Sequence, residues 1–168
     1  MLKKICIVII SVTTLLLTGC NFDGEEYKTP SQQAEELQSD IIECFINKDK
    51  ETLKSYYSKY VIENYTNIDT QIDEAFDFID GEIVSYDEPF PSECGGMEKK
   101  SYGAQTQNII TDKGTEYKIS FEGWLTNEEE PEKVGVSYIR VIDMTGSYDS
   151  SKTDKENGIL WIGGEDFI

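Results

Sequence analysis

The stretch AFDFIDGEIVSY, residues 75–86, decides the fold of this chain because its hydrophobic period changes partway along. Phe76 and Ile79 belong to an apolar stripe at helical spacing. Gly81 follows, and glycine suits the left-handed conformation that often ends a helix. After Gly81 the helical period is lost, and the sequence EIVSY at 82–86 is typical of a short strand. We therefore predict helices before this stretch and strands after it.

Working outward toward the N-terminus, the pattern predicts three helices. The first starts near Thr29 to Ser31, with Pro30 in an early position, and carries an apolar stripe that includes Cys44. Asp49 can cap a second helix that runs to about Tyr60, and Asp69 can cap a third that ends at Gly81.

Toward the C-terminus the chain reads as consecutive short strands separated by turns. The turn-rich segment 87–96 follows the first strand, and Asp112-Lys113-Gly114 is suited to a hairpin turn. We predict an α+β fold in which three N-terminal helices pack on a curved antiparallel sheet of four to five strands. The strands are expected at 82–86, 100–111, 115–125, 134–144 and 159–162.

Two stretches carry a resemblance to a known fold, AFDFIDGEIVSY at 75–86 and VGVSYIRV at 134–141. With the order of elements from Ala34 to Ile162, they resemble small bacterial lipoproteins of unknown function with a nuclear-transport-factor-2-like, or cystatin-like, cone. The resemblance implies three helices against a strongly curved sheet and, in many such proteins, dimers formed sheet to sheet. It does not imply a chemistry, because one fold can host enzymes and binding modules alike.

The N-terminus is typical of an export signal. Lys3 and Lys4 precede an uncharged stretch from Ile5 to Thr18 that is short for a membrane-spanning helix. Leu17-Thr18-Gly19-Cys20 resembles the lipobox of bacterial lipoproteins, which implies acylation of Cys20. We expect a signal peptide at 1–19, a lipidated Cys20 and tether at 20–30, and a single α+β domain at 31–168. The alternative is an uncleaved anchor helix with an incidental cysteine. The lipid would hold the protein on the outer face of the cytoplasmic membrane.

The amino-acid composition excludes several classes of binding and catalysis. The chain has 33 acidic and 15 basic residues, a net charge of −18, so we do not expect it to bind nucleic acid. It contains no histidine, which excludes histidine-based catalysis and histidine metal ligands. Cys44 and Cys94 are too few for a cysteine metal cluster. They either form a disulfide or stay separate, with Cys44 in the apolar face of a helix. We expect no cofactor and no metal.

Arg140, the only arginine, is the first candidate for ligand binding. Strand alternation places it on the more apolar face, where a guanidinium needs a partner, together with Val134, Val136, Tyr138 and Ile142. That partner is either a ligand anion at the mouth of the cone or a helix carboxylate such as Asp77 or Glu74.

Trp124 is the second candidate. It shares a strand face with Lys118, Ser120 and Glu122, while Tyr117, Ile119, Phe121 and Leu125 line the better core face. The exposed ring can stack on a ligand, or it can be covered by a loop or a dimer partner. Tyr138 and Tyr117 complete our candidate ligand-binding residues.

No catalytic residue can be assigned, since no nucleophile, base and orienting group can be assembled from the sequence. We therefore expect a non-catalytic module that binds a small anionic ligand or a protein partner near the membrane. One alternative is a carboxylate-based hydrolase or isomerase in the cone cavity, using Asp143 or Glu122. The other is a structural module that acts as a homodimer.

Overall fold

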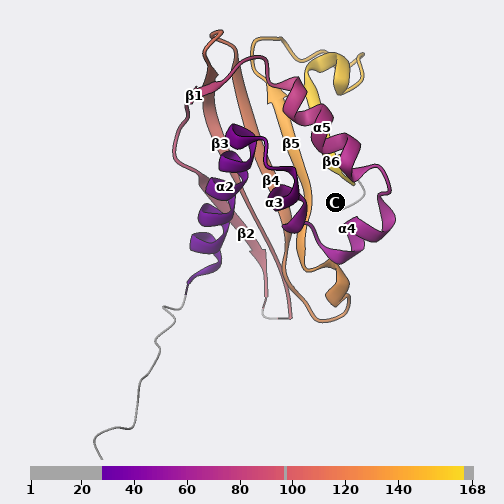
Figure 1. The fold of residues 1–168 in the computed structure, drawn as a ribbon. Helices are drawn as coiled ribbons and strands as arrows, with labels where there is room; N and C mark the ends of the chain where they lie inside the picture. Colours follow the sequence, from indigo (N-terminus) through magenta and orange to yellow (C-terminus); the bar gives the residue numbers. More distant parts are fainter. Residues whose placement is uncertain (1–27, 97, 165–168) are drawn as a thin grey trace, which may run out of the picture.

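The computed structural model describes residues 28–96 and 98–164 of the chain (Figure 1). The predicted signal peptide, the lipobox and Cys20 lie outside these residues. The predicted α+β class is confirmed, with helices first and strands after them along the chain. The described α-helices are α2 (Pro30–Asn47), α3 (Lys50–Ser55), α4 (Lys59–Asn64) and α5 (Ile68–Phe78). Two short 3-10 helices, Pro131–Lys133 and Lys155–Asn157, lie between strands later in the chain.

The strands form one open antiparallel sheet in the order β1-β3-β4-β5-β6, and β2 also pairs with β3. Since β4 occupies the other edge of β3, strands β1 and β2 share one edge, at opposite ends. The bounds are β1 (Ile83–Ser85), β2 (Phe90–Gly95), β3 (Lys99–Thr111), β4 (Glu116–Asn127), β5 (Gly135–Asp143) and β6 (Ile159–Gly163).

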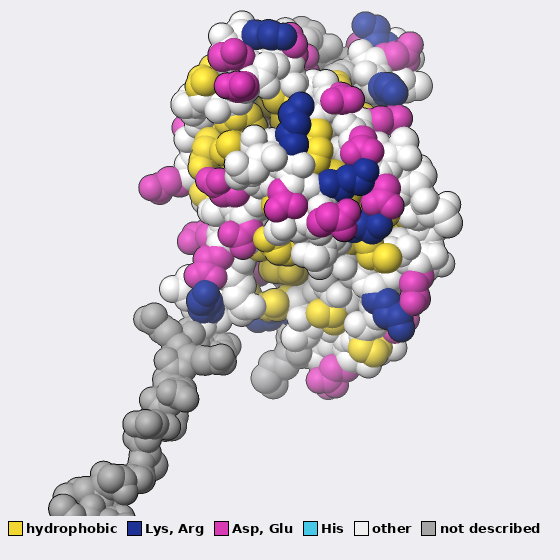
Figure 2. All heavy atoms as spheres, in the orientation of Figure 1, with side chains coloured by type: hydrophobic (Ala, Val, Ile, Leu, Met, Phe, Trp, Pro, Cys, Tyr) yellow, Lys and Arg dark blue, Asp and Glu magenta, His cyan; other side chains and the backbone are white. Residues whose placement is uncertain are grey.

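The helices form a layer on one face of the sheet, the face toward the viewer in Figure 1. Between the two layers lies a single apolar core, in which the largest fully buried side chains include Phe121, Ile41, Ile42, Leu53 and Ile72. Figure 2 shows the outside of the helix layer, where acidic side chains outnumber basic ones, in keeping with the net charge of −18. The helices pack on one face of the sheet through this core. No helix among the described residues covers the other face of the sheet.

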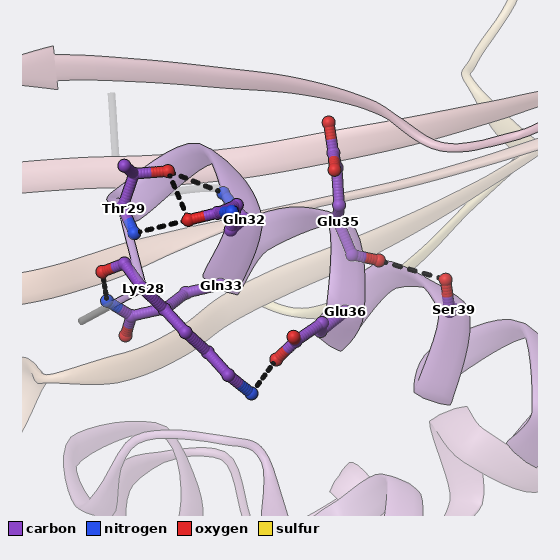
Figure 3. A network of polar contacts seen from close by, with 7 residues as sticks. All are labelled: Lys28, Thr29, Gln32, Gln33, Glu35, Glu36 and Ser39. Carbon is purple, nitrogen blue, oxygen red and sulfur yellow. Dashed lines mark hydrogen bonds and ion pairs between the residues drawn. The ribbon is translucent and has the colours of Figure 1, made fainter. Parts of the chain in front are cut away.

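The first described helix begins in a well-capped turn (Figure 3). The Thr29 side chain accepts a hydrogen bond from the backbone N–H of Gln32, and the Gln32 side chain accepts one from the backbone N–H of Thr29. This reciprocal capping box satisfies two backbone donors that the helix leaves unpaired. The Gln33 side chain donates to the carbonyl of Lys28, and Lys28 pairs with Glu36 over 2.5 Å. The domain therefore has a defined first turn at the predicted position.

The second predicted helix, from Asp49 to about Tyr60, is wrong as a single helix. Asp49 does cap α3 by accepting from the backbone of Thr52, but the chain leaves the helix at Tyr57 and restarts at Ser58, the N-cap of α4. Between the two helices Ser58 N–H donates to the carbonyl of Val136, and Val136 N–H donates to the carbonyl of Tyr56. These bonds attach the chain to the beginning of β5, and a continuous helix could not make them.

The segment predicted as turns, 87–96, contains strand β2, so the described sheet has six strands rather than four or five. Strand β2 was not predicted because it contains Pro91 and Gly95, and both residue types are rare inside strands. A proline is tolerated on an edge strand, where its missing N–H costs no hydrogen bond within the sheet.

Candidate functional site

The face assignment predicted for Arg140 is wrong, and the cause is an irregularity in the sheet. Glu122 on β4 pairs with Tyr138 on β5, but the next residue, Gly123, pairs with Val136, so Ser137 is an extra residue. Such a bulge reverses the alternation of side chains along the strand. Val136 therefore lies in the core, while Tyr138 and Arg140 lie on the face of the sheet away from the helices.

A row of aligned side chains crosses this uncovered face. Strand pairing places Phe90, Gln105, Ser120, Arg140 and Trp161 next to one another, from β2 through β6. Neighbouring strands are about 4.8 Å apart, so adjacent members of the row are within contact distance of each other. The row brings together residues that are up to 71 positions apart and forms the centre of the candidate site.

A depression of about 200 Å³ lies along this row. We call it the Arg140 depression. Ser92 and Ser120 have short side chains, and the Ala104 and Phe121 side chains are buried in the core, so little fills this part of the face. Longer side chains surround the space, and its walls are Phe90, Gln105, Glu122 and Arg140. The volume is below the range typical of drug-sized ligands, so the depression suits a small molecule or a single chemical group.

Two polar atoms beside the depression have no hydrogen-bond partner among the described residues. They are Oγ of Ser120 and Nε of Arg140, and both are buried. Buried polar groups are usually paired, because an unpaired one loses its hydrogen bonds to water without replacement. An acceptor that reached these two atoms would remove that cost.

Two cations lie side by side on the uncovered face. No ion pair to Arg140 or Lys118 occurs within 28–96 and 98–164, although the chain has a large excess of acids. Burial, together with the charge of Arg140, lowers the pKa of Lys118. Neither predicted helix partner of Arg140, Asp77 or Glu74, can pair with it, because the sheet separates them.

One carboxylate, that of Glu122, lines the same depression. Burial raises the pKa of Tyr138 well above its ordinary value, and a hydrogen bond to Glu122 raises it further. Tyr138 therefore stays protonated at physiological pH and can act as a donor to Glu122. The depression thus has a cation on one wall and a carboxylate on another.

Trp161 supports the arginine. The guanidinium carbon of Arg140 lies 5.2 Å from the centre of the Trp161 ring, within the range of a cation–π contact. The Tyr138 ring packs edge-on against Trp161 at 5.0 Å between centroids. These contacts limit the rotamers of Arg140 and hold its charge beside the depression.

The structure brings together three of the four predicted ligand-binding residues. Arg140, Tyr138 and Trp124 lie on the uncovered face, and Trp124 also receives a cation–π contact from Lys99 at 4.8 Å. Tyr117 lies on the opposite face, in the core, where its hydroxyl donates to the carbonyl of Phe78 and accepts from Asp80 N–H. Ile119 and Phe121 are in the core, as predicted.

Phe90, Gln105 and Trp161 were not predicted as site residues, and Ser120 was predicted only to share a strand face with Trp124. Phe90 lies on the unpredicted strand β2, and Gln105 and Trp161 come from strands whose register with β4 and β5 the sequence does not give. For Ser120 and Glu122 the sequence did hold a signal, because strand alternation places both side chains on the same face as Trp124.

Of the remaining predicted residues, two cysteines and two acids, only Glu122 lines the Arg140 depression. Cys44 is buried in α2 and Cys94 is exposed on β2, and both are free thiols, so the disulfide alternative has no support. Asp143, one of the two acids considered for catalysis, ends β5 and accepts hydrogen bonds from the backbone and hydroxyl of Thr145. Glu122, the other acid, lines the depression.

Within the described ranges, no group of three or more Cys, Asp or Glu side chains is placed to hold a metal ion. No helix in that part of the chain is both long enough and apolar enough to cross a membrane.

These features define an α+β protein with a helix layer on one face of an open antiparallel sheet and a small polar depression on the other. The chain belongs to the family described as Domain of unknown function (DUF5104), whose model matches residues 40–144. The match includes Ser120, Glu122 and Arg140 and ends before Trp161. A comparison with curated proteins finds no match.

Proposed function

We propose that this protein is a lipid-anchored, extracytoplasmic binding module that holds a small ligand at the Arg140 depression. The observation that carries the proposal is Arg140 itself. It lies against Trp161 beside an open depression, its Nε has no partner among the described residues, and no described carboxylate forms an ion pair with it. Keeping the buried Nε of Arg140 without a hydrogen-bond partner costs stability, and a ligand that pairs with it explains why the arrangement is useful.

The proposed location rests on the N-terminal sequence. Residues 1–19 have the features of a signal peptide, and Leu17-Thr18-Gly19-Cys20 resembles a lipobox. The described domain begins at Lys28, so the segment from Cys20 to the first helix turn spans at most about 35 Å when fully extended. A domain on such a tether would sample ligands close to the membrane surface.

The anchor is tested by expressing the full-length protein in a bacterial host supplied with labelled palmitate. We expect label on the full-length protein and its recovery in the membrane fraction, with both lost in Cys20→Ser. Cys94→Ser, a change at an exposed cysteine on β2, is the control and should keep both. Equal labelling of Cys20→Ser and wild type would refute the anchor.

Ligand binding is tested by a thermal-shift screen of small polar metabolites against the full-length protein in detergent. Wild type and Arg140→Gln are screened in parallel, since a ligand that binds the native state raises the melting temperature. We expect at least one compound to stabilise the wild type and not the variant. If every stabilising compound acts equally on both proteins, Arg140 is not part of the binding site.

The uncovered face also favours a second candidate, a homodimer formed sheet to sheet. Phe90 is 68% exposed on this face, and Trp124 and Trp161 are only partly covered, so a second copy would bury aromatic area. This arrangement agrees with the nuclear-transport-factor-2-like cone that the sequence resembles, which we retain as part of the proposal. Light scattering at micromolar concentration separates the candidates, because a monomer at that concentration leaves the face open to a ligand.

A further inference from the structure

The Arg140 depression presents two opposite charges to one small space. Arg140 and Glu122 both line it, on neighbouring strands β5 and β4, and they are in adjacent rows of the pairing pattern. They do not form an ion pair with each other within 4.0 Å. A pair of unlike charges that line the same space without meeting leaves room for a ligand that carries the complementary pair.

The arginine side of the depression is suited to a carboxylate. The guanidinium is a planar fork of N–H donors that matches the two oxygens of a carboxylate, and the nearby Ser120 hydroxyl adds another donor. Lys118 adds positive charge beside Arg140. A ligand without an anionic group would leave the two positive charges without an ion-pair partner.

The glutamate side is suited to an ammonium group. The Tyr138 hydroxyl interacts with the Glu122 carboxylate, which helps to fix its position, while a carboxylate still has further lone pairs for other donors. A ligand that carried only negative charge would be attracted by Arg140 and Lys118 but repelled by Glu122. A ligand with both charges meets an opposite charge at each end.

Phe90 provides an apolar wall at the other end of the row. Phe90 is 68% exposed, and it lines the same depression as Arg140. A ligand whose ionic end reached Arg140 and Glu122 could place an apolar side chain against this ring.

We propose that the Arg140 depression binds a free amino acid with an apolar side chain, its carboxylate on Arg140 and Ser120 and its ammonium on Glu122. This inference rests on the proposed function and narrows it to one class of ligand. The volume of about 200 Å³ fits a molecule of this size and is too small for a folded partner.

Both tryptophans of the chain, Trp124 and Trp161, lie on the uncovered face, so intrinsic fluorescence reports on this surface. We would titrate the full-length protein in detergent with three matched probes while exciting only tryptophan. L-phenylalanine carries both charges, N-acetyl-L-phenylalanine lacks the ammonium, and L-phenylalaninamide lacks the carboxylate. We expect saturable binding of L-phenylalanine and at least tenfold weaker binding of each blocked probe.

Variants assign the two ends of the ligand. Arg140→Gln and Glu122→Gln should each weaken binding of L-phenylalanine at least tenfold, and Glu122→Gln should remove the penalty against N-acetyl-L-phenylalanine. Glu63→Gln, on α4 in the helix layer, is the matched control and should bind as wild type does. Ser120→Ala replaces Arg140→Gln if circular dichroism shows that the arginine variant does not fold.

The other outcomes separate this inference from the proposed function. If N-acetyl-L-phenylalanine binds as tightly as L-phenylalanine and Glu122→Gln has no effect, the ligand is a simple anion and the amino-acid assignment is wrong. If none of the three probes changes the fluorescence, the assignment is also wrong. In either case an Arg140-dependent compound from the thermal-shift screen would leave the proposed function standing.

Discussion

The indole Nε1 of Trp161 donates a hydrogen bond to Oδ2 of Asp154 over 2.8 Å, which ties the loop before β6 to the uncovered face of the sheet. Asn157 folds the same loop, because its side chain donates to the carbonyls of Asp149, Lys152 and Thr153 and accepts from Asp149 N–H. The loop therefore positions Trp161, and Trp161 in turn lies against Arg140. This connection runs from a surface loop to the centre of the candidate site.

Asp154→Ala should loosen Trp161 without touching the Arg140 depression directly. We expect a loss of about 1.5 kcal/mol in the free energy of unfolding, since a hydrogen bond to a charged acceptor is removed. The tryptophan emission should also move to longer wavelength. Urea unfolding followed by fluorescence measures both effects. Lys155→Ala, an exposed change in the same loop, is the control, and an equal effect of the two changes would contradict the role of Asp154.

Gly123→Ala should disturb the bulge that places Arg140. A Cβ at Gly123 would lie 2.2 Å from the carbonyl oxygen of Gly135, and backbone atoms cannot yield as a flexible side chain can. We expect destabilisation of about 2–3 kcal/mol, measured by urea unfolding followed by circular dichroism. Gly146→Ala provides the comparison because a Cβ there meets nothing within 4 Å. A fully stable Gly123→Ala would mean that the bulge is absent.

Gln38→Leu should weaken the attachment of α2 to the sheet. Gln38 is fully buried, and its Nε2 donates to Thr106 Oγ1 at 3.2 Å and to the carbonyl of Ile119 at 3.1 Å. Leucine would leave both acceptors in the core without this donor, at a cost of about 1–3 kcal/mol. Glu35→Leu, on the exposed side of the same helix, should change the unfolding free energy by less than about 0.5 kcal/mol. Equal effects in chemical denaturation would show that the buried bonds contribute nothing.

Cys44 should resist alkylation in the native protein. Burial, and then the negative charges of Asp49, Asp40 and Glu43, raises the pKa of its thiol to about 11. Because the raised pKa favours the neutral thiol, reactivity is low at pH 8 and rises only as the pH approaches 11. The shift from the ordinary value of 9.0 slows iodoacetamide labelling about a hundredfold, before any steric protection.

Peptide mass spectrometry at Cys44 and Cys94 measures this labelling. Denaturation should remove the protection of Cys44, whereas the exposed Cys94 reacts in both states. A native Cys44 that is alkylated as fast as Cys94 at pH 8 would contradict the burial that raises its pKa.

The local sequence determined much of this fold. The change of period around Gly81 predicted helices before strands, the capping residues Thr29 and Asp49 predicted two helix starts, and Gly114 predicted the β3–β4 hairpin, where its φ is 80°. These features depend on residues close together in the chain, so local periodicity and capping chemistry are enough to predict them. The composition likewise excluded histidine chemistry without any structure.

Tertiary structure alone decided the candidate site. One extra residue, Ser137, reversed the faces along β5 and moved Arg140 from the predicted core to the uncovered surface. The same pairing aligned Arg140 with Phe90 and Trp161, which are distant in sequence. A side chain's face on a strand depends on the register of hydrogen bonds with its neighbours, and a shift of one residue reverses it. That register is set by long-range packing, which the sequence does not show. Strand alternation therefore predicted correctly which residues share a face within the regular part of β5, but not across the bulge.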